Sequence, residues 1–81
     1  MPFYTYILIS EITGRRYFGS CEDMDKRLSN HNAGKVKSTK AYLPYRLHYF
    51  ETYDTRGEAL AREKFFKTVE GYKYLKSMKV I

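Results

Sequence analysis

Apolar and polar residues alternate at the start of the chain, from Phe3 to Ser10. β-Branched and aromatic residues dominate this stretch, and both features are typical of a β-strand. Because successive side chains of a strand point to opposite faces, the pattern predicts two distinct surfaces. One would carry Phe3, Thr5, Ile7 and Ile9, and the other would carry Tyr4, Tyr6 and Leu8.

A turn around Gly14 and a second strand, Arg16–Gly19, are predicted to follow and to pair with the first strand in an antiparallel hairpin. This pairing places Tyr17 and Gly19 on the face that carries Tyr6. Cross-strand aromatic pairs stabilise sheets, which explains either tyrosine without any function. A strand glycine weakens a sheet or lets another backbone approach, and we interpret Gly19 as a bare patch that admits a phosphodiester.

The next apolar residues recur with helical spacing. We predict Ser20 as the N-cap, with Asp23 three residues on in a variant of the capping box, and a helix that runs to about Ala33 before Gly34. At 3.6 residues per turn, one stripe of roughly 100° would face the sheet. That stripe carries Met24, Arg27, Leu28 and His31.

Arg27 and His31 are unusual members of an apolar stripe. Their i, i+4 spacing directs both side chains to one place. An arginine offers a fixed fork of donors that suits phosphate oxygens, and a histidine exchanges a proton near neutral pH. On this helix alone a structural interpretation is the more usual one: His31 would be a hydrogen-bonded core residue, and Arg27 would extend its charge to solvent.

The middle of the chain is basic. Lys35–Pro44, with the sequence KVKSTKAYLP, is predicted as a loop. Its lysines are either a solvated surface or contacts to phosphate groups. We assign Lys35, Lys37 and Lys40, together with Arg46 in the segment that follows, to nucleic-acid binding.

Tyr45–Tyr53 has the composition of a third strand. Uninterrupted alternation would place Leu47, Tyr49 and Glu51 on one face and His48, Phe50 and Thr52 on the other.

Two helices are predicted to complete the chain. Thr55 and Glu58 form a capping box that opens a helix through about Val69, Gly71 would stop it, and residues 72–78 would form a short last helix. The order ββαβαα predicts an α+β fold, a small three-stranded antiparallel sheet flanked by helices, in a single domain over residues 1–81.

Glu63 lies at the edge of the apolar face of the longer predicted helix, between Ala59 and Phe66. An ordinary explanation is a boundary residue paired with Lys64 or Lys67. A lone carboxylate facing a basic cleft also suits Mg²⁺ held against a substrate phosphate, since Mg²⁺ commonly takes one or two protein carboxylates and keeps several waters. No second acidic residue has a matching context, so a two-metal site is not expected.

Composition narrows the class of partner. Fifteen Lys and Arg against nine Asp and Glu give 81 residues a net charge of +6 and a pI near 9.5. A compact basic domain favours polyanions, and nucleic acid is the commonest of these. A merely soluble basic protein is the alternative.

The single cysteine, Cys21, excludes an intrachain disulfide and a multi-cysteine zinc site. It is consistent with a reducing cytosol, so we expect a cytoplasmic protein. The start MPFYTYILIS lacks a basic n-region and a cleavage site, and Glu11 interrupts it. Neither a signal peptide nor a membrane partner is expected.

Five motifs stand in a definite order along the chain. They are Tyr4-Thr5-Tyr6, Tyr17-Phe18-Gly19, Arg27 with His31, the stretch HNAGKVKSTKAYLPYRLHYFE and Ala61-Arg62-Glu63-Lys64. In order and spacing they resemble the GIY-YIG nuclease domain, particularly its short stand-alone bacterial members, over nearly the whole chain. The first two motifs stand at the GIY and YIG positions, and Glu63 stands at the metal-binding glutamate of the family.

The chain departs from the family pattern in several respects. Tyr4 stands in place of the glycine of GIY and Thr5 in place of its isoleucine, so that only Tyr6 is retained. A late asparagine of some members has no counterpart after Gly71, and the DNA-binding domains attached to homing and repair relatives are absent from this sequence.

The resemblance implies phosphodiester hydrolysis with one divalent ion. Glu63 would hold Mg²⁺ or Mn²⁺ against the scissile phosphate, and Arg27 would neutralise charge on the phosphoryl oxygens. Tyr6 would relay a proton from the attacking water to His31, and Tyr17 would orient water or phosphate. Because a free phenol has a pKa of about 10, His31 and Arg27 are expected to favour the deprotonated form of Tyr6.

The predicted function is therefore a metal-dependent endonuclease that acts on nucleic acid, taken here as DNA, in repair or recombination. The alternative is a basic module of the same fold that holds nucleic acid or a protein without cutting. A purely structural role ranks third, because the catalytic positions of the family are occupied. The oligomeric state is left open, with a monomer as the simplest case.

Overall fold

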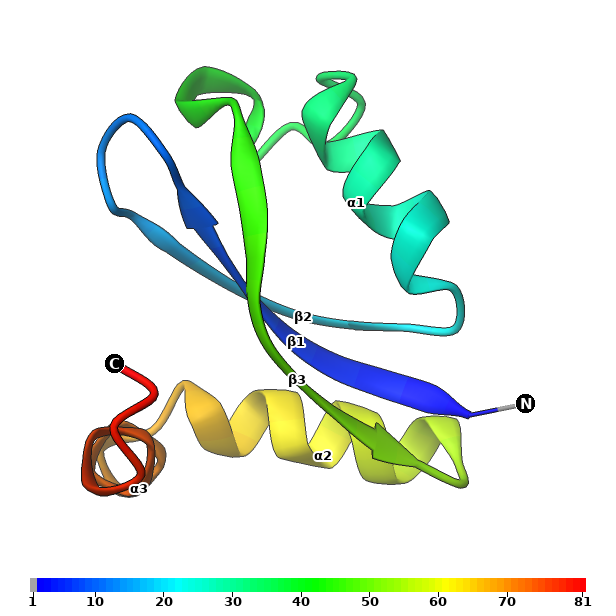
Figure 1. Ribbon diagram of the computed structural model, residues 1–81. Helices are drawn as coiled ribbons and strands as arrows, with labels where there is room; N and C mark the ends of the chain where they lie inside the picture. Colours follow the sequence, from blue (N-terminus) through cyan, green and yellow to red (C-terminus); the bar gives the residue numbers. More distant parts are fainter. Residues whose placement is uncertain (1) are drawn as a thin grey trace.

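A three-stranded antiparallel sheet in the order β2-β1-β3 forms the centre of the computed structural model, which describes residues 2–81 (Figure 1). The elements are β1 (Phe3–Ser10), β2 (Arg16–Cys21), α1 (Met24–Asn32), the 3₁₀ helix η1 (Lys40–Tyr42), β3 (Tyr45–Tyr53), α2 (Arg56–Phe66) and α3 (Val69–Ser77). The predicted α+β fold with ββαβαα order is confirmed.

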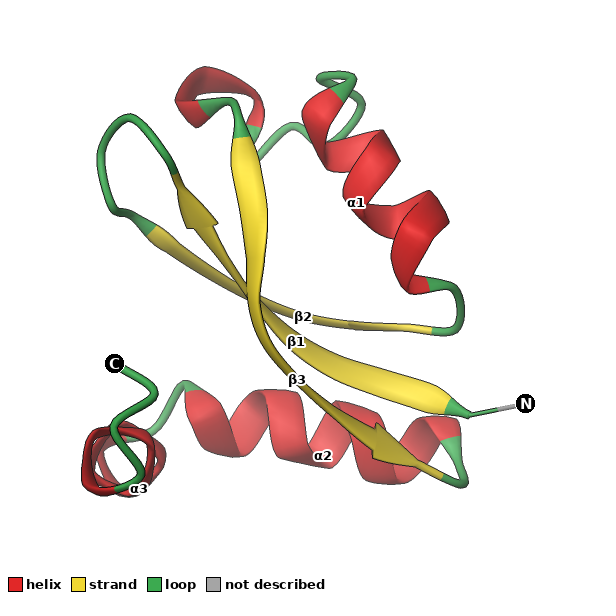
Figure 2. Cartoon of the chain, viewed as in Figure 1, coloured by secondary structure: helices red, strands yellow, loops and turns green. Residues whose placement is uncertain are grey.

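Helix α1 covers one face of the sheet and α2 covers the other, with α3 packed at the end of α2 (Figure 2). The central strand β1 supplies both interfaces because its side chains alternate. Tyr6 and Leu8 are fully buried in the cluster beneath α1, whereas Ile7 is fully buried against Phe66 and Leu75 on the opposite side. The predicted alternation of this strand is confirmed.

Helix α2 is joined to all three strands by polar contacts. The hydroxyl of Thr5 in β1 donates to the carbonyl oxygen of Ala59 at 2.6 Å. On β3, Glu51 accepts a hydrogen bond from Nε of Arg62 at 2.8 Å. The third contact joins Glu63 to β2 and belongs to the candidate site. Together they set the rotation of α2 about its axis.

Uninterrupted alternation in β3 is a wrong prediction. Ile7 pairs with Tyr49 while the next residue, Leu8, pairs with Leu47, so His48 is the extra residue of a β-bulge. As a result Leu47 packs on the α1 side and Tyr49 packs on the α2 side. Side chains before and after a bulge therefore exchange faces relative to a regular strand. Nothing in the local composition indicates the bulge.

The start of α1 also differs from the prediction. Strand β2 continues through Ser20 to Cys21, and the N-cap is Asp23, whose carboxylate accepts from the Lys26 backbone N–H at 3.1 Å. Ser20 stays in the strand because β1 pairs with it through Thr5. The predicted end of the helix near residue 33 is confirmed.

Helix α2 ends at Phe66, earlier than predicted, and Gly71 does not stop it. Thr68 caps α3 instead, and Gly71 lies in the first turn of that helix. A Cβ at Gly71 would lie 2.7 Å from the backbone carbon of Phe65, so only glycine allows the two helices to meet this closely. Across residues 2–81, none of the helices has the length and apolar character that a membrane crossing requires.

Candidate active site

Four predicted site residues converge beneath α1. Nε of Arg27 donates to the hydroxyl oxygen of Tyr6 at 3.2 Å, and the same oxygen lies 3.2 Å from Nε2 of His31. The Tyr17 ring meets the imidazole edge-on, with 4.8 Å between the ring centroids. Strands β1 and β2 supply the tyrosines, and one face of α1 supplies the other two side chains.

The end of α1 is tied to β3, which holds His31 in place. The side-chain amide of Asn32 bonds both backbone groups of Tyr45, donating to its oxygen at 2.9 Å and accepting from its N–H at 2.7 Å. His31 is fully buried beside this clamp. The helix therefore cannot rotate the imidazole away from Tyr6 without breaking two hydrogen bonds.

Gly19 has a different role from the one predicted. It pairs with Tyr6, and a Cβ added to it would lie 2.5 Å from Cζ of the Tyr6 ring. The space above Gly19 is thus filled by this ring and is not a bare patch for a phosphodiester. The glycine serves the site indirectly, because it lets the phenol lie flat across β2 and reach His31.

Burial decides the protonation states of this cluster. It raises the pKa of Tyr6 to about 12, against a smaller lowering by Arg27. Burial, with a contribution from the same guanidinium, lowers the pKa of His31 from 6.5 to about 4. Arg27 thus favours the ionised form of Tyr6, as expected, but burial outweighs it: at pH 7 the phenol keeps its proton, and the imidazole is a neutral base beside it.

Arg27 is a half-buried cation. The hydrogen bond with Tyr6 is the largest cause that raises its pKa, so it stays charged. Within residues 2–81, no carboxylate forms an ion pair with Arg27. A cation that has lost part of its water and lacks a counter-ion attracts an anionic ligand.

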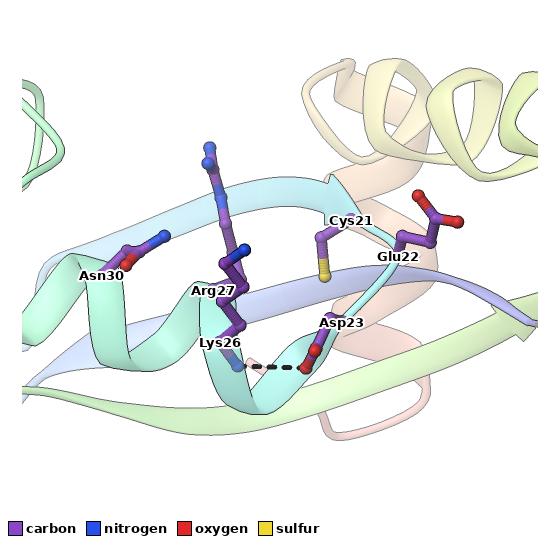
Figure 3. Close-up of a pocket in the computed structure, with 6 residues that line it drawn as sticks. All are labelled: Cys21, Glu22, Asp23, Lys26, Arg27 and Asn30. Atoms are coloured by element: carbon purple, nitrogen blue, oxygen red, sulfur yellow. Dashed lines mark hydrogen bonds between the residues drawn. The ribbon is translucent and has the colours of Figure 1, made fainter.

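A hollow of about 430 Å³ opens in front of this guanidinium (Figure 3). Its walls are formed by Cys21, Glu22, Asp23, Lys26, Arg27 and Asn30. Two of the acidic groups are already engaged: Glu22 pairs with Arg56 at 3.2 Å, and Asp23 caps α1. The hollow is thus lined by two carboxylates that already have partners and by two cations, Arg27 and Lys26, that form no ion pair within residues 2–81.

Glu63 lies on α2, on the other side of the edge strand β2. Its carboxylate accepts from the Ser20 hydroxyl at 2.9 Å and from Nζ of Lys67 at 2.8 Å. The Glu63 side chain is 16% exposed, so part of it reaches solvent. Lys67 is one of the two predicted partners of Glu63, and its pairing leaves the Glu63 side chain partly exposed.

The acidic groups fit a single-carboxylate metal site. Among residues 2–81, His, Cys, Asp and Glu nowhere gather in a group of three or more that suits a metal ion. Glu63 alone, with spare lone pairs on both oxygens, suits Mg²⁺ or Mn²⁺ completed by waters and a substrate phosphate. Lys67 is 52% exposed, so its ammonium group can turn to solvent when a divalent ion takes its place beside Glu63.

The four predicted nucleic-acid contacts are not among the residues that line the hollow. Lys35, Lys37 and Lys40 are exposed in the segment between α1 and β3. Arg46 is exposed on β3 opposite Ile9, next to the buried Tyr45.

The roles of two residues of the site were not predicted from the sequence. Thr39 is buried beneath His31, with its hydroxyl oxygen 2.9 Å from Nδ1. Ser20 was predicted as a helix cap, yet it is the residue that holds Glu63. A threonine and a serine in polar stretches carry no local signal of such contacts, because both partners are distant in sequence.

The comparison with known families agrees with this arrangement. A family model described as the GIY-YIG catalytic domain matches residues 2–75. This chain belongs to the GIY-YIG family. Within it, the residues singled out by the resemblance on β1, β2 and α1 are the four that converge under α1.

Small bacterial members of the family are similar to this GIY-YIG chain. A UPF0213 protein of Bacillus licheniformis is 43% identical over 65 residues, which cover 79% of this chain and 66% of that protein. A UPF0213 protein of Staphylococcus saprophyticus is 42% identical over 74 residues, covering 90% and 89%. The chain thus spans about two thirds of the first relative and most of the second.

A solved structure has the same fold. The solution NMR structure of a UPF0213 protein from Bacillus halodurans is 32% identical to this GIY-YIG chain, with a TM-score of 0.56. The match covers 98% of this chain and 86% of that one.

Proposed function

We propose that this GIY-YIG domain is a divalent-metal-dependent nuclease that hydrolyses phosphodiester bonds in DNA. The observation that carries the proposal is the state of Arg27. It is a half-buried cation without a carboxylate partner in residues 2–81, it borders a hollow, and it bonds the Tyr6 hydroxyl. A phosphate bound to its terminal amino groups would lie beside the pair formed by Tyr6 and His31.

The chain's own groups supply a route for the proton. Water gives a proton to the Tyr6 oxygen while the phenolic proton passes to Nε2 of His31, and the water oxygen bonds to phosphorus. The ester P–O bond breaks, the departing oxygen takes a proton from solvent, and His31 later releases its proton. One water is consumed, and a phosphomonoester and a hydroxyl group are formed.

Arg27 has to move before this step. Tyr6 has no exposed surface, so water reaches its oxygen only after a bound phosphate draws the guanidinium outward. Glu63 would hold Mg²⁺ or Mn²⁺ at the opposite side of β2. When bound, the divalent ion offsets negative charge on the phosphate and on the departing oxygen.

A cleavage panel tests the proposal. Single-stranded, duplex, branched and flapped DNA, with matched RNA, are incubated with Mg²⁺ or Mn²⁺. We expect metal-dependent cleavage that falls about 100-fold in Glu63→Gln and in Arg27→Gln, since each variant removes one charge that stabilises the transition state.

The controls are charge-matched. Glu70→Gln and Lys73→Gln change exposed residues of α3 outside the site and should cut at the wild-type rate. Cleavage that survives in Glu63→Gln and Arg27→Gln would contradict the assigned site, and no cleavage with either metal would contradict nuclease function.

A binding module is the second candidate, and one observation favours it. Both Glu63 oxygens accept hydrogen bonds, and Tyr6 has a pKa of about 12, so the resting site holds neither a free carboxylate nor an ionised phenol. This candidate predicts salt-dependent binding to DNA without turnover under any metal.

A further inference from the structure

Thr39 has a fully buried side chain although it lies in a segment of exposed lysines. Its Oγ1 is 2.9 Å from Nδ1 of His31 and 3.3 Å from the carbonyl oxygen of Val36. Val36 already accepts the backbone N–H groups of Thr39 and Lys40. The contact that specifically needs the Thr39 hydroxyl is therefore the one with the imidazole.

The hydrogen bonds of Tyr6 determine which nitrogen of His31 carries the proton. Arg27 can only donate, so it occupies a lone pair of the Tyr6 oxygen. Within residues 2–81 the remaining partner of that oxygen is Nε2 of His31, which must accept the phenolic hydrogen. A buried hydroxyl left without an acceptor would cost about 1–3 kcal/mol.

The other ring nitrogen follows from this assignment. A neutral imidazole has one N–H, so with Nε2 as acceptor the hydrogen is on Nδ1. Nδ1 then donates to the Thr39 oxygen, and the Thr39 hydroxyl hydrogen is left to point at the Val36 carbonyl oxygen. Each group in this series therefore donates to the next: Arg27 to Tyr6, Tyr6 to His31, and His31 to Thr39.

We propose that Thr39 is a positioning residue that holds His31 in the Nδ1–H tautomer and so keeps Nε2 free to take the phenolic proton of Tyr6. The effect on rate rests on the proposed nuclease function, whereas the tautomer is a property of the free chain. Without the hydroxyl, an Nδ1–H would be buried with no acceptor. The Nε2–H form, which cannot take the proton from Tyr6, would then gain population.

The test uses two substitutions that differ in one group. Thr39→Val keeps the shape and removes the hydroxyl, and Thr39→Ser keeps the hydroxyl and removes a methyl group. Side-chain ¹⁵N chemical shifts report the tautomer of His31 in labelled chain at pH 7, and a His31→Gln spectrum separates its signals from those of His48.

We expect Nδ1–H in the wild type and in Thr39→Ser, and a shift toward Nε2–H in Thr39→Val. Cleavage of the best DNA substrate should fall about tenfold in Thr39→Val and stay near the wild-type rate in Thr39→Ser. Thermal unfolding is recorded beside each rate. A loss of packing alone would affect Thr39→Ser as well, because that variant loses a buried methyl group.

Two results would overturn the proposal. One is a Thr39→Val chain with the wild-type tautomer, and the other is a Thr39→Ser chain that loses the wild-type tautomer together with Thr39→Val. If the wild-type chain cuts no substrate, the proposed nuclease function fails, and the ¹⁵N shifts still decide the role of Thr39.

Discussion

At the residue scale, the candidate site depends on the absence of a side chain at Gly19 and on the buried ring of Tyr6. Gly19 gives the Tyr6 ring room to lie across β2, and His31 meets the hydroxyl at the far end of that ring. Burial keeps the phenol protonated and the imidazole neutral. A donor and an acceptor of one proton are thus held 3.2 Å apart before any substrate arrives.

Gly19→Ala tests the role of this glycine. The new Cβ would overlap Tyr6 and push the ring out of place, so we expect a loss of about 1–3 kcal/mol in the free energy of unfolding and loss of cleavage. Urea unfolding measures the first effect. Gly57→Ala, where a Cβ meets nothing within 4 Å in the first turn of α2, is the control and should be neutral or stabilising. Equal effects at the two glycines would contradict the contact.

His31 should make stability depend on pH. Its pKa is 6.5 in an ordinary setting and about 4 in the folded chain, so the unfolded chain binds more protons between these values. Stability is therefore expected to fall as the pH is lowered from about 6.5 to about 4, by up to about 3 kcal/mol. Urea unfolding at constant ionic strength measures it, and His31→Gln should flatten this window. An unchanged slope in that variant would rule out the buried imidazole as its source.

At the element scale, helix α2 brings the carboxylate to the sheet. Contacts from Ala59 to β1, from Arg62 to β3 and from Glu63 to β2 fix its rotation. Helix α3 then packs at its end, where Leu75 joins the cluster around Ile7. The position of Glu63 thus depends on how two helices meet at a sharp corner.

Gly71→Ala should disrupt the close contact between α2 and α3. The added Cβ would lie 2.7 Å from the Phe65 backbone, and a backbone cannot turn aside as a side chain can. We expect a loss of about 3 kcal/mol in the free energy of unfolding, which thermal and urea unfolding can measure. Glu70→Ala, at an exposed position of the same turn, is the control. A Gly71→Ala chain as stable as the control would show that α3 docks differently.

At the scale of the whole molecule, the chain is basic. The net charge is +6, and the exposed lysines between α1 and β3 lie in the segment that also contains Thr39. If this segment contacts phosphates, each contact releases counterions and makes binding depend on salt. The same segment would then hold nucleic acid and orient His31.

Binding to duplex DNA in EDTA tests this arrangement. Lys35→Ala with Lys37→Ala should reduce the slope of log K against log salt concentration by about 0.9 for each phosphate contact that is lost. Lys73→Ala with Lys76→Ala removes the same charge from exposed positions of α3 and should leave the slope near the wild-type value. Equal slopes in the two double variants would mean that only net charge attracts the DNA.

Much of this protein was determined by its sequence alone. The order of elements, the two faces of β1, the shared face of Tyr6, Tyr17 and Gly19, and the stripe of Arg27 and His31 all follow from periods of two and 3.6 residues. Such periods depend on neighbours along the chain, so they can be read without the fold. The family resemblance rests on the same local motifs.

The tertiary structure decided what depends on distant neighbours. The bulge at His48 and the close contact of α2 with α3 at Gly71 arise from strand pairing and helix docking. The spacing of apolar residues along the chain does not predict either of them. Ser20 beside Glu63 and Thr39 beneath His31 are contacts across the fold. Burial outweighs the effect of Arg27 on the pKa of Tyr6, and the sequence could not show this, because desolvation depends on how much protein surrounds a group and not on its place in a motif.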